Sequence, residues 1–382
     1  MDQILSRLQQ LRDPHQNESK ALQLCVDVIN ELNKDLDSKE IDTELLIDSG
    51  FIEFCVDVFE NHSTLNNESK RIVAEVIAEI AKIENSRIPC SEEGIMKPLI
   101  AMLSDSDKKL VMQSCRAIGN VCYDNDIGRK VFADKRGIHE LLALMNRLHD
   151  EFPQNMNKDA GVPNGRLLAV VSGCLLNSTN TFEYALEIAI EEGLIDVLLK
   201  YLRKFLSINE EIAIHCLLLL HCLADSDLGL SHICEITVLK ELISLLDGNI
   251  TEATVEALVE FFTNLSEDDS MKTKMTQLGL PQKLVELLNR NMYEDSVRKV
   301  ILDFVTLILT EDVSMNLLYD SGNGDLYKQC TAWINSKDES MMKFGVLAIA
   351  NFARSDTNCI NMVKDGVHLK LLVITKQNST ID

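Results

Sequence analysis

The feature that most constrains this chain is an internal repeat. A short signature, in which a turn residue precedes an apolar pair and a leucine-rich segment, recurs through the 382 residues. Its copies begin at Gly50, Gly94, Gly137, Gly193, Thr237, Gly279, Gly324 and Gly366. The intervals are 44, 43, 56, 44, 42, 45 and 42 residues. A unit of this length buries its apolar side only against its neighbours, so the sequence predicts a stack of similar modules.

The stretch Met341–Gly366 is the clearest copy of the module. It predicts a helix with one apolar stripe, because four apolar residues recur at helical spacing: Phe344, Leu347, Ala348 and Phe352. A polar turn follows, and a second helix is expected from about Cys359 to Gly366, where glycine favours the left-handed end of a helix. Another helix then begins. Three helices with a period of 42–44 residues match armadillo repeats, so we predict an all-α, right-handed armadillo-repeat solenoid.

The remaining segments complete the domain prediction. Residues 1–40 are expected to form capping helices, and residues 41–376 about eight armadillo units. The long interval after Gly137 contains a proline-bearing segment at 149–163 that predicts a surface loop. Residues 377–382 predict a disordered tail. The array shows no polar capping repeat at its end, which is expected of a fragment or a short isoform.

Composition limits the class of partner. The chain has 60 acidic and 37 basic residues, a net charge of −23. This excludes a simple nucleic-acid binder, which needs clustered Lys and Arg, and it favours either a basic partner or solvation alone. Eleven cysteines scattered over apolar helix faces, without a CxxC pair, predict reduced thiols and a cytoplasmic protein. The sequence predicts no signal peptide and no direct membrane insertion.

Counted from the short helix that ends at the glycine, each module has the signature helix second and the long helix with the apolar stripe third. Aligning these third helices places a polar residue at the same late position in most of them. These residues are Glu79, Asn120, Asn177, His221, Asn264 and Asn351, with Asp124 following Asn120 in the same groove. Such an amide can bond the backbone of the neighbouring repeat. It can equally bind the backbone of an extended peptide, because each amide both donates and accepts. The sequence leaves both alternatives open.

Acidic residues concentrate between Phe205 and Asp312, where 19 acids face 7 bases, a net charge of −12. Four polar residues spaced by four share one face of a predicted third helix: Glu252, Glu256, Glu260 and Asn264. Asp268 extends this patch, and Asp303 falls on the next third helix. We predict that this patch binds a polybasic segment; the alternative is a solvated convex face.

No catalytic constellation or cofactor site is predicted. The motif His215–Cys222 places its end residues roughly 10 Å apart along a helix, too far to share a zinc ion whose ligands lie about 2 Å away. We therefore predict no metal, no cofactor and no enzyme.

One class that the Asn ladder suggests is the importin-α-like adaptor. In that class a Trp lies one turn before each Asn. Here the corresponding positions hold Arg116, Gly173, Leu217, Glu260 and Leu347, and the single tryptophan, Trp333, is elsewhere. This argues against a receptor for nuclear signals.

A second class is closer. The segments RIPC at Arg87–Cys90, RAIGNVCYDNDIGR at Arg116–Arg129 and AIANFARSDTNCINMVKDG at Ala348–Gly366 resemble the small-GTPase dissociation stimulator family (SmgGDS). Weaker similarity covers nearly the whole chain. The resemblance implies an armadillo solenoid that binds small GTPases of the Rho, Ras and Rap type through a prenylated, polybasic C-terminus, and that acts as a chaperone and, for some of them, in nucleotide exchange.

The resemblance also implies roles for individual residues. Contact with the GTPase is expected of Asn351, Arg354, Asn358, Asn264 and Asp303, and contact with its basic tail of Glu252, Glu256, Glu260 and Asp268. Small residues such as Ala117, Gly119 and Gly173 either open a slot for the prenyl group or allow close helix packing. The chain is expected to be a monomer. The competing hypothesis is an armadillo scaffold that binds a peptide without exchange activity.

Overall fold

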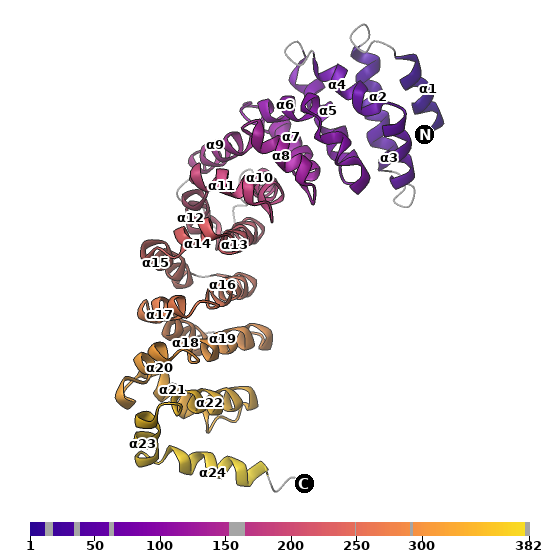
Figure 1. The fold of residues 1–382 in the computed structure, drawn as a ribbon. Helices are drawn as coiled ribbons and strands as arrows, with labels where there is room; N and C mark the ends of the chain where they lie inside the picture. Colours follow the sequence, from indigo (N-terminus) through magenta and orange to yellow (C-terminus); the bar gives the residue numbers. More distant parts are fainter. Residues whose placement is uncertain are drawn as a thin grey trace. The chain divides into compact units, whose positions relative to one another are not determined.

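The structure is a computed structural model that describes residues 1–11, 18–33, 39–60, 65–152, 165–248, 250–290 and 293–378. Within these ranges the regular secondary structure is helical and includes no strand. The chain divides into two compact units, Met1–Gly229 and Leu230–Asp382, and Figure 1 labels their helices.

The helices of the first unit are α1 (Asp2–Gln10), α2 (Glu18–Leu32), α3 (Lys39–Asp48), α4 (Phe51–Glu60), α5 (Asn67–Ile80), α6 (Glu93–Met102), α7 (Lys108–Cys122), α8 (Asp126–Asp134), α9 (Gly137–Asp150), α10 (Gly165–Thr179), α11 (Glu183–Glu191), α12 (Leu194–Phe205) and α13 (Glu210–Ala224). Two 3₁₀ turns, η2 (Glu84–Ser86) and η3 (Pro89–Ser91), replace the short first helix between α5 and α6.

The helices that follow are α14 (Asp227–Ile233), α15 (Ile236–Ser244), α16 (Glu252–Leu265), α17 (Asp269–Gln277), α18 (Leu280–Arg290), α19 (Asp295–Ile308), α20 (Asp312–Tyr319), α21 (Asp325–Trp333), α22 (Glu339–Phe352), α23 (Asp356–Lys364) and α24 (Val367–Asn378). The short turns η5 (Leu245–Asp247) and η6 (Asp320–Gly322) complete the regular structure of the described residues.

The predicted module is confirmed in both units. The eight signature positions lie at the start of the second helix of a module, from α4 after Gly50 to α24 after Gly366. Gly366 has φ +76°, the left-handed conformation that the sequence predicts at the end of α23, and Gly193 has φ +88° before α12. Both angles are costly for residues with a Cβ.

The third helices pack against one another within each unit. In the first unit α7 packs on α5 and α10, and α10 on α13; in the second, α19 packs on α16 and α22 (Figure 1). A polar side chain accepts a hydrogen bond from the first turn at the N-terminus of several third helices, namely Asn66 before α5, Asp107 before α7, Asn209 before α13, Thr251 before α16 and Asp338 before α22. Such caps fix where each helix begins.

The core lies between the helix layers of each unit. In α22 the buried residues differ from the predicted apolar stripe at one position. In α22 the side chains of Phe344, Ala348 and Phe352 are buried, but Leu347 is 52% exposed. The three buried residues are spaced by four and follow one ridge of the helix, whereas Leu347 lies beside that ridge and faces outward. Leu347 is therefore available for contacts outside the core.

The predicted insertion at 149–163 and the predicted tail at 377–382 lie mainly outside the described residues. Among the described helices, none is by itself long and apolar enough to cross a membrane; α13 and α14 meet the length and composition limits only as a pair, which is bent by 115°.

Candidate functional site

The acidic residues predicted on the second unit lie on two adjacent third helices. Glu256 and Glu260 are on α16 and Asp303 is on α19, which packs directly against α16. Glu260 and Asp303 are exposed and Glu256 is half-buried. None of the three forms an ion pair or a hydrogen bond with the part of the chain that the structure describes. We call Glu256, Glu260 and Asp303 the acidic face.

Two other residues of the predicted patch are already engaged. Glu252 accepts a hydrogen bond from the backbone N–H of Glu294, at 3.1 Å, and so lies at the N-terminus of α19. Asp268 accepts from the N–H of Ser270 at 2.7 Å and caps α17. A carboxylate near a helix N-terminus stabilises that helix. Both residues therefore stabilise helices of the second unit. The sequence analysis had expected both to contact the basic tail of the partner.

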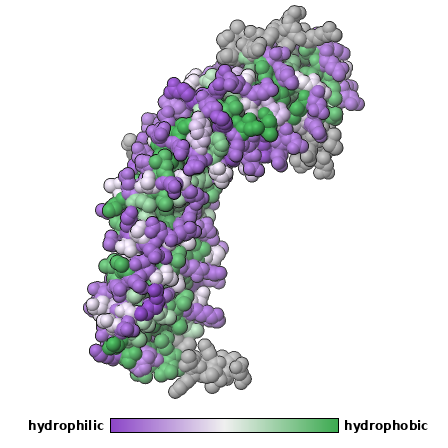
Figure 2. Space-filling view, viewed as in Figure 1, coloured by the Kyte–Doolittle hydropathy of each residue, from purple (hydrophilic) through white to green (hydrophobic). Residues whose placement is uncertain are grey.

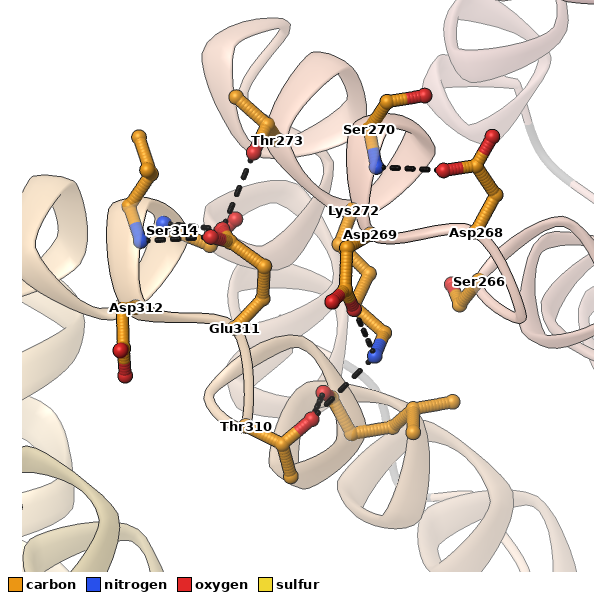
Figure 3. Close-up of polar contacts among 12 residues, drawn as sticks. Ser266, Asp268, Asp269, Ser270, Lys272, Thr273, Thr310, Glu311, Asp312 and Ser314 are labelled. Atoms are coloured by element: carbon orange, nitrogen blue, oxygen red, sulfur yellow. Dashed lines mark hydrogen bonds and ion pairs between the residues drawn. The ribbon is translucent and has the colours of Figure 1, made fainter.

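The turn containing Asp268 belongs to a polar network that joins successive modules (Figure 3). The Lys272 ammonium lies 2.8 Å from Asp269 and 3.4 Å from the Thr310 hydroxyl, beyond the end of α19. In the next turn Glu311 caps α20 by accepting from the N–H groups of Val313 and Ser314.

Burial by itself would raise the pKa of Glu311, but the hydrogen bonds that it accepts lower its pKa below the usual value. Thr273 also donates to this carboxylate, at 3.1 Å, and connects α17 to α20. The sequence reasoning missed this network, although an acidic residue directly before a short helix is a recognisable capping signal.

The residues predicted to contact the GTPase body have different environments. Asn358 is buried, and its amide donates to the Asn316 side chain at 3.2 Å, across the α20–α23 boundary. Arg354 donates to the Thr310 carbonyl at 2.6 Å and to Asp312 at 3.0 Å, so it joins two modules while remaining exposed. Asn351 is half-buried near the end of α22, and its amide makes no hydrogen bond to the described residues. Of these three side chains, Asn351 is the best placed to bind a partner.

In the first unit the ladder amides bond the neighbouring repeat. Asn120 donates to the Ala78 carbonyl of α5 at 2.8 Å, and Asn177 donates to the Gly119 carbonyl of α7 at 3.1 Å. This is the first of the two alternatives that the sequence left open. Peptide binding by these amides stays a prediction.

A buried ion pair completes this ladder. Glu79 is 8% exposed and accepts from Arg116 at 2.8 Å and from Lys82 at 2.5 Å. Burial would raise the pKa of Glu79, but the hydrogen bonds from Lys82 and Arg116 lower it below the usual value. Arg116, which is half-buried, therefore binds the neighbouring third helix of the first unit, a role that the aligned sequence did not predict.

The remaining ladder residues are Asp124, which is exposed with φ +47° in the turn after α7, and His221, which is half-buried on α13. The small residues pack the helices closely. A Cβ added at Gly119 would lie 3.3 Å from the Cα of Cys174, and one at Gly173 would lie 3.2 Å from the His215 ring. Close packing, the second interpretation of these glycines, therefore accounts for both.

Comparison with known proteins supports the motif analysis. Residues 87–123 match the armadillo/beta-catenin-like repeat family. The chain is 28% identical to Rap1 GTPase-GDP dissociation stimulator 1-A of Xenopus laevis over 338 residues, which is 86% of this chain and 53% of that protein. This chain is a relative of the GTPase-GDP dissociation stimulators. The resemblance predicted from its motifs is confirmed.

A further relative is the GTPase-GDP dissociation stimulator vimar of Drosophila melanogaster, 27% identical over 82% of this chain and 49% of its own length. The chain thus spans about half the length of the curated relatives it matches.

Solved structures agree on the fold. An engineered protein aligns over 96% of this chain and 82% of its own, with a TM-score of 0.68 and 17% identity. A designed armadillo repeat protein aligns over 66% of this chain and 99% of its own, with a TM-score of 0.52 and 16% identity. The prediction of an all-α armadillo-repeat protein is confirmed.

Proposed function

We propose that this chain regulates small GTPases by binding their polybasic, prenylated C-terminal tail at the acidic face and by promoting release of GDP. The observation that carries the proposal is the set of three carboxylates, Glu256, Glu260 and Asp303, without a cationic partner among the described residues. Its relatives are named as stimulators of GDP dissociation from GTPases, including Rap1.

The physical basis for tail binding is charge complementarity. Carboxylates on adjacent helices that lack their own cations attract a chain of lysines and speed its encounter with the surface. Because these groups are solvent-accessible, salt screens them over about 10 Å at 0.1 M ionic strength. Tail binding is therefore expected to weaken steeply with salt.

Neighbouring side chains are assigned supporting roles. Asn351 is proposed to bind the partner backbone through its amide, and Asn264 and Arg354 to contact the partner beside the tail. Glu252 and Asp268 support the site through the helices that they cap and contribute negative charge to it. Asn358 is buried and bonds the preceding module, which supports a role in positioning α23 and not a direct contact with the GTPase.

Promotion of GDP release requires no bond chemistry. A partner that binds the nucleotide-free GTPase more tightly than the loaded form shifts the equilibrium by that difference in affinity. We therefore propose a monomeric, cytosolic regulator and not an enzyme.

The test is release of fluorescent GDP from a panel of Rho-, Ras- and Rap-type GTPases, with and without the full chain. Each GTPase is used with its tail, with tail lysines changed to glutamine, and without its tail. The proposal predicts faster GDP release that falls when the tail lysines are neutralised and when salt rises. Equal release from all three forms would refute tail binding; tail binding without any GDP release would favour the scaffold hypothesis.

A further inference from the structure

The second unit carries an exposed apolar surface that the proposed function does not use. Its members are Val313 and Leu317 on α20 and Ile360 and Val363 on α23, with exposed fractions of 52%, 49%, 56% and 48%. We call these four residues the apolar ridge. Figure 2 shows hydrophobic residues among hydrophilic ones along the edge where Figure 1 labels α20 and α23.

Direct contacts hold the two halves of the apolar ridge together. The Asn358 amide of α23 donates to the Asn316 side chain of α20 at 3.2 Å, and Asn316 is exposed beside Leu317. The Tyr319 hydroxyl of α20 donates to the Asn358 carbonyl at 3.4 Å. Each helix presents its aliphatic pair one turn apart, at i,i+4 on α20 and at i,i+3 on α23. The ridge is therefore a surface of two rows on adjacent helices of one unit.

The fold does not require aliphatic side chains at these positions. Counted from its capping residue, the short helix α17 of the preceding module has Ser270 at the second position and Lys274 at the sixth. Counted in the same way, α20 has Val313 and Leu317. Single exposed aliphatic residues are ordinary, but an apolar patch with a polar rim indicates a contact surface.

The rim of the apolar ridge is acidic. Asp320 follows α20, Asp356 begins α23 and Asp365 follows it; all three are exposed and form no ion pair within the described ranges. Of the nearby cations, Arg354 is already paired with a carboxylate of α20, at 3.0 Å. Lys364 is the one cation of α23. The rim therefore carries more negative than positive charge and attracts the cations of a partner.

The size of the ridge matches one short helix. Packed helices lie about 8–10 Å apart, so a helix that crosses both rows needs roughly seven residues, or about two turns. Apolar residues spaced i, i+3, i+4 and i+7 on such a helix meet the aliphatic side chains of both rows. Lysine or arginine on either side of that stripe meets the aspartates of the rim.

We propose that the apolar ridge docks a basic amphipathic helix of a partner protein, with its apolar stripe on Leu317 and Ile360 and its cations beside the rim aspartates. The inference goes beyond the proposed function, because the ridge lies on the short helices α20 and α23, whereas the acidic face lies on the third helices α16 and α19. The surplus of aspartates disfavours an acidic peptide and an anionic lipid surface as occupants.

The experiment uses the full chain and a fluorescent synthetic helix of about four turns, with leucine along one face and lysine on the other. A shuffled peptide of the same composition has no apolar face. Anisotropy measures binding of both peptides to the wild type and to the double variant Leu317→Gln/Ile360→Gln, since glutamine suits an exposed helix position. The matched control is Leu347→Gln, because Leu347 is 52% exposed on α22 of the same unit.

We expect saturable binding of the amphipathic peptide to the wild type, at least tenfold weaker binding to the double variant and less than a twofold change in Leu347→Gln. The shuffled peptide should bind the wild type at least tenfold more weakly than the amphipathic one. Equal binding of the amphipathic peptide to the wild type and the double variant would overturn the inference, and so would equal binding of the two peptides to the wild type.

A second pair of changes tests the charge of the rim. Asp320→Asn keeps the size of the side chain, and asparagine tolerates the left-handed backbone, φ +43°, at this position. Together with Asp365→Asn, it should weaken binding of the amphipathic peptide at least threefold at low salt. Unchanged affinity would overturn the assignment of a basic occupant.

A lysine-rich tail peptide without an apolar face tests the proposed function separately. It should bind the wild type, the double variant and Leu347→Gln equally, which also reports that the variants are folded. If the wild type fails to bind this peptide but binds the amphipathic one, the tail site is refuted and the ridge inference stands. Self-association of the wild type in sedimentation, abolished in the double variant, would make a second copy of the chain the occupant and overturn the inference.

Discussion

The two units use the polar side chains of their third helices differently. In the first unit Glu79 pairs with Arg116, and Asn120 and Asn177 bond the backbone of the preceding third helix. In the second unit Glu256, Glu260 and Asp303 have no such partners among the described residues. A polar side chain of a third helix therefore serves stability where a donor or acceptor of the neighbouring module reaches it, and remains available for a ligand where none does.

The largest expected effect concerns the second unit. Replacing Glu256, Glu260 and Asp303 by lysine turns attraction into repulsion for a lysine-rich tail peptide. At up to about 1 kcal/mol per exposed pair, the triple variant should lose roughly 2–3 kcal/mol, or about 30- to 150-fold in affinity. Fluorescence anisotropy of the labelled peptide at low salt measures this loss.

The matched control changes net charge equally at another place in the same unit. Asp320, Asp325 and Asp365 are exposed and lie outside the acidic face. Their replacement by lysine should change peptide affinity by less than threefold. Equal losses in the two triple variants would mean that net charge, and not this surface, attracts the peptide.

The next largest effect concerns the stability of the first unit. Glu79→Ala leaves the Arg116 guanidinium without its buried carboxylate and should lower the free energy of unfolding by about 2 kcal/mol. Glu256→Ala should change it by less than about 0.5 kcal/mol, because that carboxylate has no partner to lose. Hydrogen exchange of the α5 and α7 amides provides a local measurement; similar protection in the two variants would contradict the distinction.

The Glu79 interaction also predicts a pH dependence. The folded-state pKa of Glu79 lies below its ordinary value of 4.5, so its contribution is complete above that value and is lost as pH falls through the folded-state pKa. Protection of α5 and α7 in the wild type should therefore fall in acid. In Glu79→Gln this part of the dependence should be absent; an unchanged acid profile would show that Glu79 is not its source.

A smaller effect separates the two kinds of asparagine. Asn177→Ala removes a hydrogen bond to the Gly119 carbonyl and should cost about 1 kcal/mol of stability with no change in peptide affinity. Asn351→Ala should leave stability within about 0.5 kcal/mol and weaken GTPase binding. Thermal unfolding and a binding titration on both variants check this, and the reverse pattern would exchange their roles.

The smallest effect concerns Glu252, which accepts from the backbone N–H of Glu294 at the start of α19. Glu252→Gln keeps an acceptor but removes the charge near the helix N-terminus, so it should cost about 0.5 kcal/mol. Exchange of the first α19 amides should become faster. A loss of more than tenfold in peptide affinity in this variant would instead place Glu252 in the binding surface.

Much of the candidate site followed from the sequence, but the pairing within it did not. The spacing by four predicted that Glu256 and Glu260 share a face of α16, and the repeat alignment predicted that Asp303 lies on the next third helix. The same alignment treated Glu79, Asn120 and Asn177 as members of a groove. It could not show that these side chains already bond Arg116 and two backbone carbonyls, because the bonded groups lie 37 to 58 residues away in the sequence.

The sequence by itself determined the armadillo module, the places where its signature helices begin and the surplus of acidic residues, since these depend on local spacing, on turn residues and on composition. It placed the start of the short helix α23 near Cys359, whereas that helix begins at Asp356. Only the tertiary structure decided which polar side chains are satisfied and which remain open. The physical reason is that a hydrogen bond or an ion pair between modules depends on how closely two helices approach, to within a few tenths of an ångström, and the period of a repeat does not specify that distance.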